Sequence, residues 1–346
     1  MRFYTGLFTG IASIMLLGAA AKAPVSLNVG LEQIIPGEIN GAPVRLRVIA
    51  SGPRTLFLNP SAVSRLGLSA GFFGGQARIG PVKKPVSSAV ISYGIERQVW
   101  KHRVLWSDAD FAPGADGGVG PGGVPQDVVT FRLSGPDGGR THVLPMVEVE
   151  SSYGALGLVR AIGGAQVAIL FDPMRDDNLA TAAAGAALSS QLGGQLKGPA
   201  RPEMIRLNVA RPVRALTLDQ PLQVGPLSLH DLMVRVGDFA DGRTIADSDE
   251  ADSSEIVVVG KKGRQRAVYN ITLGRRALAR CSSLVFDKPR KQIRPTCEID
   301  ERHGQGCQSR HRPPPPPRLF VAQRVYGIEG GRAAGREIAE DHPDRC

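Results

Sequence analysis

Carboxylates that follow predicted strands are the side chains of this chain most able to do chemistry. Asp172 stands directly after the apolar run Ile169-Leu170-Phe171 and before Pro173-Met174. Two carboxylates held about 3 Å apart divide acid and base roles, because their like charges move the two pKa values apart. Whether Asp172 is a catalytic residue of this kind depends on the turns in both halves of the chain. The alternative is a turn aspartate that only hydrogen-bonds its own backbone.

Other motifs for catalysis or cofactor binding are missing from the sequence. Four further aspartates stand at turns or strand ends, where local hydrogen bonding is their usual role: Asp108, Asp110, Asp116 and Asp127. No Gly-x-Ser-x-Gly elbow occurs, and the histidines are scattered without a nucleophile motif. Residues 117–123 are Gly-rich but do not lead into Lys-Ser or Lys-Thr, which argues against a phosphate loop. Cysteine and histidine spacing does not suit zinc, so we expect neither a metal nor a cofactor.

The elements that would position Asp172 are short strands joined by many turns. Abundant glycine and proline with few aromatic residues favour this over long helices. The second half has an alanine-rich helix predicted at residues 180–192, which ends at Gly193-Gly194. Alternating or apolar runs predict its strands at residues 167–171, 205–209, 213–218, 232–236, 256–259, 269–273 and 284–286.

The first half contains a sharp turn, Ala50-Ser51-Gly52, in the place that Asp172 has in the second. Asn40-Gly41 predicts a two-residue hairpin before it, and Asn59-Pro60 starts a short helix at residues 61–66 after it. The first half has its predicted strands at residues 44–48, 55–58, 89–91, 99–106 and 128–133.

The two halves repeat the same order of features. Each has a strand, a sharp turn, a short helix, further strands and a late turn of apolar residues and glycine. The late turns are Gly118-Val119-Gly120 and Leu273-Gly274. A repeat of this length suggests a duplicated lobe.

These features together resemble the retropepsin-like and pepsin-like aspartic proteases, especially their small bacterial relatives. In that family the first turn reads Asp-Thr-Gly-Ala, and here Ala50-Ser51-Gly52-Pro53 stands in the same slot. The late turns with Gly118, Gly120 and Gly274 resemble the glycine elements that brace the active-site turns. The resemblance implies an all-β fold with short helices, arranged as two pseudo-symmetric lobes.

The same resemblance implies catalysis by two aspartates, one from each lobe, that share a proton across a bound water. By this resemblance, which the turns of both halves carry, Asp172 is the candidate catalytic residue. Ala50 replaces the first aspartate, and Pro173-Met174 replaces Thr-Gly after Asp172. We therefore expect a catalytically inactive relative that binds an extended peptide or a protein partner in the cleft between the lobes. One alternative is an active endopeptidase that uses Asp172 with an unrecognised second carboxylate. Another is an unrelated β-rich envelope protein.

The ends of the chain differ from its middle. Residues 1–23 have the pattern of a secretory signal peptide: Arg2, an apolar stretch at 6–17 that is too short to span a bilayer, then small residues. We expect its removal to leave a periplasmic or secreted protein without a transmembrane segment; a retained N-terminal anchor is the alternative. The remainder divides into a first lobe at 24–150, a second lobe at 151–299 and a Pro/Arg-rich tail at 300–346. That composition predicts disorder, with a Pro-rich binding segment as the alternative.

All four cysteines lie in the last quarter of the chain. Cys281 and Cys297 flank a predicted hairpin, so we expect them to form a disulfide in an oxidising compartment. A bridge between Cys307 and Cys346 would be a long and speculative closure. Free buried thiols are the alternative.

The formal net charge of +10 is unevenly distributed. Residues 260–294 are strongly basic, and residues 238–255 just before them are acidic. We expect these segments to pair with each other. The alternative is a basic face that meets an anionic envelope surface. No aromatic residues alternate with the basic ones as a stacking surface would require, so we expect no nucleic-acid partner.

Overall fold

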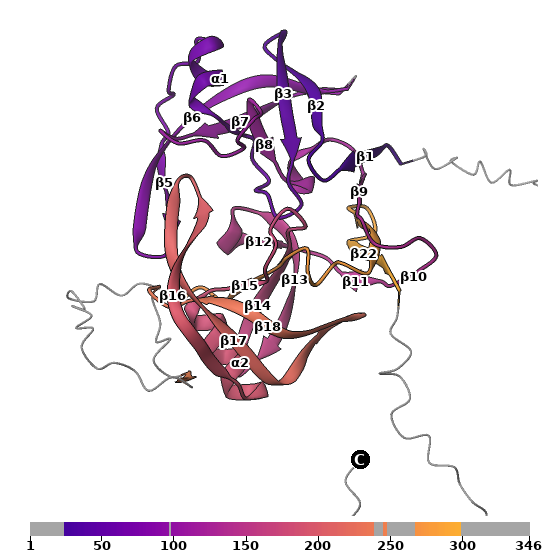
Figure 1. The fold of residues 1–346 in the computed structure, drawn as a ribbon. Coiled ribbons are helices and arrows are strands. Elements are labelled where there is room, and N and C mark those ends of the chain that lie inside the picture. The colour runs from indigo at the N-terminus through magenta and orange to yellow at the C-terminus, as the bar shows by residue number, and fades with distance from the viewer. Residues whose placement is uncertain (1–23, 97, 239–244, 248–266, 299–346) are drawn as a thin grey trace, which may run out of the picture. The chain divides into compact units, whose positions relative to one another are not determined.

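The computed structural model describes residues 24–96, 98–238, 245–247 and 267–298. All of them belong to a compact unit of residues 1–299, which is separate from residues 300–346. The predicted signal peptide, the predicted strand at 256–259, the tail and Cys307 and Cys346 lie outside the described residues. The described part is mostly β with few short helices, as the sequence predicts (Figure 1).

A seven-stranded sheet forms most of the first half. Its order is β2-β3-β8-β4-β7-β6-β5, and its strands are β2 (Ile34–Ile39), β3 (Ala42–Val48), β4 (Phe57–Leu58), β5 (Gly75–Ile79), β6 (Val82–Ile95), β7 (Gln98–Trp106) and β8 (Gly117–Val119). Asn40 and Gly41 both have positive φ and join β2 to β3, which confirms the predicted hairpin. Helix α1 (Pro60–Arg65) follows β4, and the 3-10 helix η1 (Pro121–Gly123) follows β8.

A nine-stranded sheet forms most of the second half. Its order is β12-β13-β14-β20-β15-β18-β17-β16-β19. The strands are β12 (Val147–Val149), β13 (Ala155–Ile162), β14 (Ala165–Phe171), β15 (Leu179–Ala180), β16 (Gln195–Arg206), β17 (Val209–Val224), β18 (Leu227–Arg235), β19 (Ala246–Asp247) and β20 (Asn270–Leu273). The 3-10 helix η2 (Glu150–Ser152) precedes β13, and helix α2 (Ala182–Leu192) follows β15. Thr181 caps α2 through a hydrogen bond from the Ala184 N–H, and Gly193 ends it with φ of 69°.

One strand prediction in this half is wrong. Residues 205–209 do not form one strand, because Leu207 and Asn208 have φ of 52° and 55° and make the turn between β16 and β17. The alternation of apolar side chains continues through this turn, so periodicity alone does not reveal it. The segment is the tip of a long hairpin.

The two sheets share one pairing pattern. In the first half β3 is parallel to β8, β8 is antiparallel to β4, and β4 is parallel to β7. In the second half β14 is parallel to β20, β20 is antiparallel to β15, and β15 is parallel to β18. The next strand in each sheet, β7 or β18, then pairs with an antiparallel hairpin, β5–β6 or β16–β17. Helix α1 follows β4, and helix α2 follows β15, the corresponding strand.

A third sheet combines strands from both halves. It contains β1 (Ser26–Gly30), β9 (Val128–Arg132), β21 (Cys281–Asp287), β22 (Gln292–Cys297), β10 (Arg140–Thr141) and β11 (Leu144–Pro145). Strand β9 pairs with β21, so the end of the first half hydrogen-bonds to the end of the second. Cys281 and Cys297 lie opposite each other on β21 and β22 and form the predicted disulfide.

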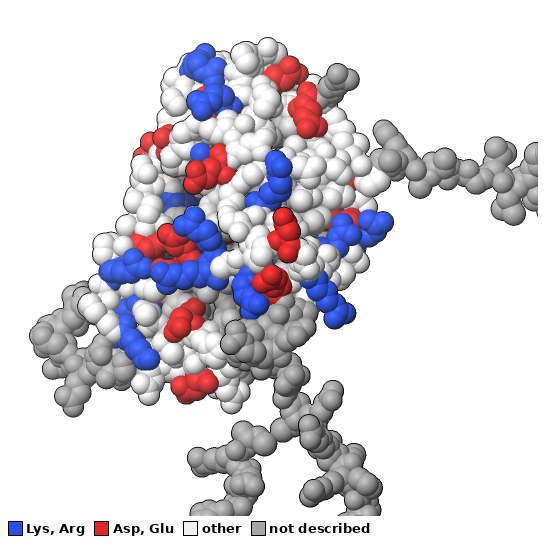
Figure 2. Space-filling view, turned by 45° about the vertical axis from the view of Figure 1, so that its right-hand side comes forward, with Lys and Arg blue, Asp and Glu red and all other residues white. Residues whose placement is uncertain are grey.

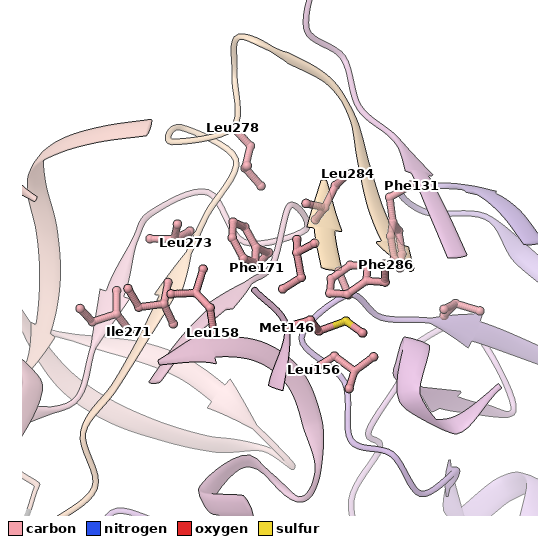
Figure 3. Close-up of a cluster of buried hydrophobic side chains, with 14 of the residues drawn as sticks. Phe131, Met146, Leu156, Leu158, Phe171, Ile271, Leu273, Leu278, Leu284 and Phe286 are labelled. Carbon is pink, nitrogen blue, oxygen red and sulfur yellow. The ribbon is translucent and has the colours of Figure 1, made fainter. Parts of the chain in front are cut away.

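The buried core continues from this third sheet into the second half. Phe131 and Phe286 contact edge to face with ring centroids 5.8 Å apart. Met146 and Leu156 lie beside them, and Phe171 at the end of β14 belongs to the same cluster (Figure 3). The strand that leads to Asp172 is therefore fixed by a continuous apolar core.

Candidate functional site

The first-half turn is held tightly against the end of β8. Ala50 is 2% exposed and Ser51 is 9% exposed. The Gly52 N–H donates to the Ile49 carbonyl at 2.8 Å, and the Gly120 N–H donates to the Pro53 carbonyl at 2.7 Å. A Cβ atom on Gly120 would lie 2.1 Å from the Gly52 carbonyl oxygen, so only glycine fits here.

The second-half turn has the same backbone pattern. The Asp172 N–H donates to the Leu273 carbonyl at 2.8 Å, and the Arg175 N–H donates to the Asp172 carbonyl at 3.1 Å. Gly274 follows Leu273, and its N–H donates to the Asn178 side-chain oxygen at 2.9 Å. A Cβ on Gly274 would lie 2.5 Å from the Asp177 carbonyl oxygen.

These hydrogen bonds align the residues of the two turns differently from the alignment that the sequence suggests. The Ile49 N–H donates to the Val119 carbonyl just as the Asp172 N–H donates to the Leu273 carbonyl. Asp172 therefore corresponds to Ile49 in the backbone, and Pro173 corresponds to Ala50. The segment between this point and the next strand, β15, is one residue shorter in the second half than the segment before β4 in the first. The resemblance and the order of features in each half instead place Asp172 opposite Ala50.

The structure brings Ser51 and Asp172 together. The Ser51 hydroxyl donates to Asp172 Oδ2 at 2.8 Å, across 121 residues of sequence. Asp172 Oδ1 accepts a hydrogen bond from the Met174 N–H at 3.2 Å. The resemblance puts a pair of aspartates at Ala50 and Asp172. In the structure the Asp172 carboxylate instead meets the hydroxyl of Ser51, the neighbour of Ala50, and a hydroxyl and a carboxylate cannot share a proton as two carboxylates do.

The remaining glycine of the predicted bracing turns, Gly118, lies in β8. A Cβ there would lie 2.8 Å from the Ile49 side chain, so Gly118 lets that side chain pack beneath the first turn. All three glycines, Gly118, Gly120 and Gly274, lie beside the two turns.

The other aspartates singled out in the sequence have local structural roles. Asp116 accepts from the Arg45 N–H and pairs with Arg65 at 2.9 Å. Asp127 accepts from the Val25 N–H at 3.1 Å. Asp108 and Asp110 are exposed, and Asp108 lies 3.4 Å from Lys84.

Two hairpins, β5–β6 and β16–β17, approach each other beside the turns (Figure 1). Ala77 and Ile79 of the first hairpin form one buried cluster with Leu207 and Val209 at the tip of the second. Tyr153, which has φ of 57°, also joins the halves: its hydroxyl accepts from the Arg78 N–H at 2.8 Å, and its carbonyl accepts from the Arg54 N–H.

Three cavities lie between these hairpins and the turns, and we call them together the cleft. The apolar cavity of about 330 Å³ is lined mainly by Phe57, Phe73, Val86, Leu105, Phe111 and Leu207. The arginine cavity of about 430 Å³ is lined by Arg78, Arg206 and Arg235 with several hydroxyl and amide groups. The turn cavity of about 80 Å³ contains Ser51 and Asp172. Arg206 lines all three.

Arg206 lines the cleft, but the sequence pattern does not single it out as a functional residue. Burial lowers the pKa of Arg206, while the charges of Tyr153 and Asp172 act in the opposite direction. Arg206 lies at the end of β16, directly before the turn at Leu207-Asn208. The sequence does not predict this turn, which becomes evident only from the pairing of β16 with β17. The sequence gives one signal for a role of Arg206 in the cleft, a basic residue directly before Leu207-Asn208.

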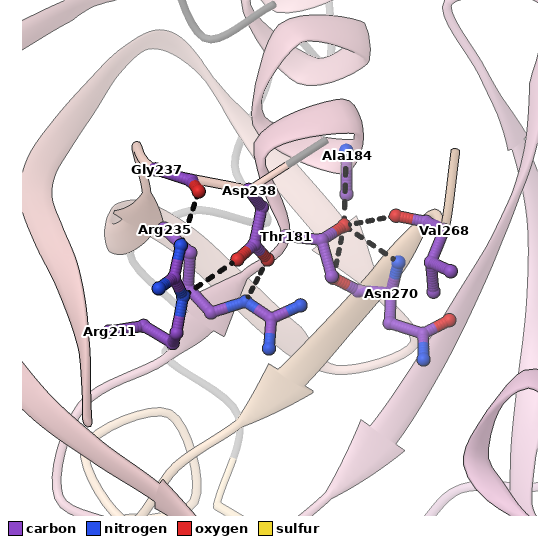
Figure 4. A network of polar contacts seen from close by, with 8 residues as sticks. All are labelled: Thr181, Ala184, Arg211, Arg235, Gly237, Asp238, Val268 and Asn270. Atoms are coloured by element: carbon purple, nitrogen blue, oxygen red, sulfur yellow. Dashed lines mark hydrogen bonds and ion pairs between the residues drawn. The ribbon is translucent and has the colours of Figure 1, made fainter. Parts of the chain in front are cut away.

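A polar network closes one side of the arginine cavity (Figure 4). Asp238 lies 3.2 Å from Arg211 and 2.6 Å from Arg235, so one buried carboxylate holds two guanidinium groups. Thr181 bonds to the carbonyls of Val268 and Asn270 beside it. Burial lowers the pKa of Arg235, and Asp238 opposes that effect.

Several described residues of the basic segment at 260–294 form ion pairs within the molecule. Arg276 pairs with Asp177, and Asp287 pairs with Arg290 and Arg294. Most of the acidic segment at 238–255 lies outside the described residues. Figure 2 shows basic and acidic side chains interspersed over the face that it draws. A role for this segment at an anionic surface stays a prediction.

No protein-family model matches this sequence, and a search of curated proteins finds no significant match. Within the described ranges, no helix is both long and apolar enough to cross a membrane. The same residues contain no group of three or more His, Cys, Asp or Glu side chains that could hold a metal ion.

Proposed function

We propose that this chain is a periplasmic or secreted aspartic-protease-like protein that has lost its catalytic pair and binds an extended peptide in the cleft. The repeated strand pairing supports two pseudo-symmetric lobes, and the six-stranded third sheet would join them. The Cys281–Cys297 disulfide is consistent with an oxidising compartment.

The contact between Ser51 and Asp172 is the observation on which this proposal rests. The turns after β3 and β14 meet there, and the meeting groups are a hydroxyl and a carboxylate. In an aspartic protease two carboxylates would meet. Ala50 and Pro173, which correspond in the backbone, bear no titratable group. Such a site can orient a ligand through hydrogen bonds but lacks the second carboxylate of an aspartic-protease pair.

An active endopeptidase is the second candidate, because three further carboxylates share a cavity with Asp172: Asp176, Asp177 and Glu203. Asp176 is paired with Arg275, and Asp177 is paired with Arg201 and Arg276. Glu203 lines a cavity of about 380 Å³ together with Asp172 and Arg175. Glu203 is already paired with Arg175 at 2.7 Å and with Arg201 at 3.6 Å. These two ion pairs favour a structural role for Glu203 over a role in acid–base chemistry.

The proposal is tested by measuring binding and cleavage of a labelled peptide library with the purified mature protein between pH 3 and pH 7. We expect bound peptides to be recovered intact. Gln76 is exposed and lines both the apolar and the arginine cavity, so Gln76→Trp should block binding. Gln166→Trp, at an exposed strand position outside these cavities, should not. Cleavage that disappears in both Asp172→Asn and Glu203→Gln would instead establish the endopeptidase.

A further inference from the structure

The cleft has two chemically different ends that meet at Arg206. Gln76, Tyr153 and Arg206 line both the apolar cavity and the arginine cavity, so the two are adjacent. A ligand long enough to enter both would present an apolar group at one end and a polar group at the other.

The apolar end is shaped for one bulky side chain. Phe57 and Phe111 stack in its wall with ring centroids 4.9 Å apart, and Leu207 closes it from the opposite hairpin. The exposed ring of Phe73 stands at its edge, where the Arg103 guanidinium lies 5.2 Å from the ring centroid. A cavity of about 330 Å³ lies within the range of small-ligand sites and accommodates an aromatic or long aliphatic side chain.

The other end has an excess of positive charge. The arginine and turn cavities are lined by four arginines, Arg78, Arg175, Arg206 and Arg235, and by two aspartates, Asp172 and Asp238. Asp238 is held by Arg211 and Arg235, and Arg175 is held by Glu203. The structure gives no hydrogen bond or ion pair to the side chain of Arg206 or of Arg78 from the described residues.

The neutral groups around Arg206 are mostly bonded to one another. The Asn270 side chain donates to Ser152 and accepts from Ser151, and the Thr181 hydroxyl donates to Val268. Of the described residues that line both the apolar and the arginine cavity, Arg206 is the charged one, and its guanidinium has no hydrogen-bond partner among them. A planar guanidinium with its donors free is suited to a carboxylate, which it binds through two parallel hydrogen bonds.

We infer that the cleft selects peptides in which a bulky apolar side chain lies next to a carboxylate, with the apolar group among Phe57, Phe73 and Phe111 and the carboxylate on Arg206. This inference rests on the proposed function, because it specifies which extended peptide the cleft takes. Arg78 from the opposite hairpin stands at the same cavity and adds a second positive charge.

Fluorescence anisotropy with defined peptides tests the inference on the unmodified protein. One set of acetylated, amidated heptapeptides contains a phenylalanine with a glutamate one or two residues away on either side. A second set replaces the glutamate by glutamine, and a third replaces the phenylalanine by alanine. A fourth set ends in phenylalanine with either a free carboxylate or an amide, which separates a side-chain carboxylate from a chain terminus.

We expect the best carboxylate peptide to bind about 10- to 100-fold more tightly than its glutamine or amide counterpart. Arg206→Gln should abolish this preference while leaving the affinity for the neutral peptide unchanged. Arg132→Gln, at an exposed arginine of β9 outside the cleft, should keep it. The comparison on the unmodified protein remains decisive even if Arg206→Gln does not fold.

The outcomes separate this inference from the proposed function. Equal affinity for glutamate and glutamine peptides would overturn the carboxylate subsite and leave peptide binding in place. Loss of both affinities in an Arg206→Gln variant that unfolds at the same denaturant midpoint as the unmodified protein would also overturn it. No binding of any peptide would overturn the proposed function and this inference together.

Discussion

The Ser51 hydroxyl donates a hydrogen bond to Asp172 Oδ2 at 2.8 Å, and this bond joins the two turns that end β3 and β14. Ser51 is almost completely buried, so its hydroxyl has little access to water as a replacement partner. The contact therefore contributes to holding the two halves together at the floor of the cleft, whatever the cleft binds.

A double-mutant cycle with Ser51→Ala and Asp172→Ala measures this contact. We expect Ser51→Ala and Asp172→Ala each to lower the free energy of unfolding, with a coupling of about 1–2 kcal/mol, because the bond is partly buried and involves a carboxylate. Urea unfolding provides the measurement. The exposed bond between Thr141 and Thr296 is the matched control, and its coupling should be within about 0.5 kcal/mol of zero. A coupling near zero for Ser51 and Asp172 would show that the two turns do not depend on each other.

Gly120→Ala should destabilise the protein by roughly 1–3 kcal/mol or more, since its Cβ would overlap the Gly52 carbonyl oxygen. Gly75→Ala is the control: no atom lies within 4 Å of the added Cβ, and Gly75 does not have positive φ. Thermal unfolding of the two variants compares them directly. Equal melting temperatures would mean that the turn at residues 49–53 is not packed against β8.

Removing the disulfide by Cys281→Ala with Cys297→Ala should lower the free energy of unfolding by about 3 kcal/mol. The bridge spans a sequence separation of 16 residues and restricts the unfolded chain by that loop. Reductant should destabilise the unmodified protein by a similar amount and leave the double variant unchanged. If reductant destabilised both proteins equally, the lost unfolding free energy would have to come from a disulfide other than Cys281–Cys297.

The free energy of unfolding should decrease at acid pH, in part because of Asp287. This side chain is 1% exposed. Burial acts to raise its pKa, but hydrogen bonds from Arg290 and the charges of Arg294 and Arg290 outweigh burial and hold the pKa below the ordinary value of 3.8. A pKa lower in the folded than in the unfolded state gives stability that is present above pH 3.8 and is lost as pH falls through the folded value.

Asp287→Asn should therefore reduce stability at pH 6 by about 1–3 kcal/mol and flatten its decline below pH 4. The reduction at pH 6 includes the loss of charge partners for Arg290 and Arg294. Denaturant midpoints measured from pH 2.5 to pH 7 give both quantities. An unchanged slope below pH 4 would assign the acid sensitivity to other carboxylates.

Local patterns in the sequence predict much of this fold. Asn40-Gly41 favours positive φ and gives its hairpin, Gly193 ends α2, and Cys281 and Cys297 pair across their hairpin. In each case the signal depends on a few neighbouring residues. The start of α2 is predicted two residues early, because Thr181 caps the helix from outside.

The candidate site depends on contacts that the local patterns do not contain. The order of features in the two halves places Asp172 opposite Ala50. The backbone instead pairs Asp172 with Ile49, because strand register is set by hydrogen bonds to β8 and β20. The turn at Leu207-Asn208 interrupts an apolar alternation without glycine or proline, so the hairpin that places Arg206 in the cleft was missed.

Hydrogen exchange of the peptide complex shows whether a peptide binds in the cleft, and mass spectrometry of the same sample shows whether it stays uncleaved. With a saturating peptide, we predict slower amide exchange in β5 (Gly75–Ile79) and near the tip of the β16–β17 hairpin, while β21 and β22 stay unchanged and mass spectrometry recovers the peptide intact. Unchanged exchange in both hairpins despite binding, or peptide fragments that disappear with Asp172→Asn, would contradict the account.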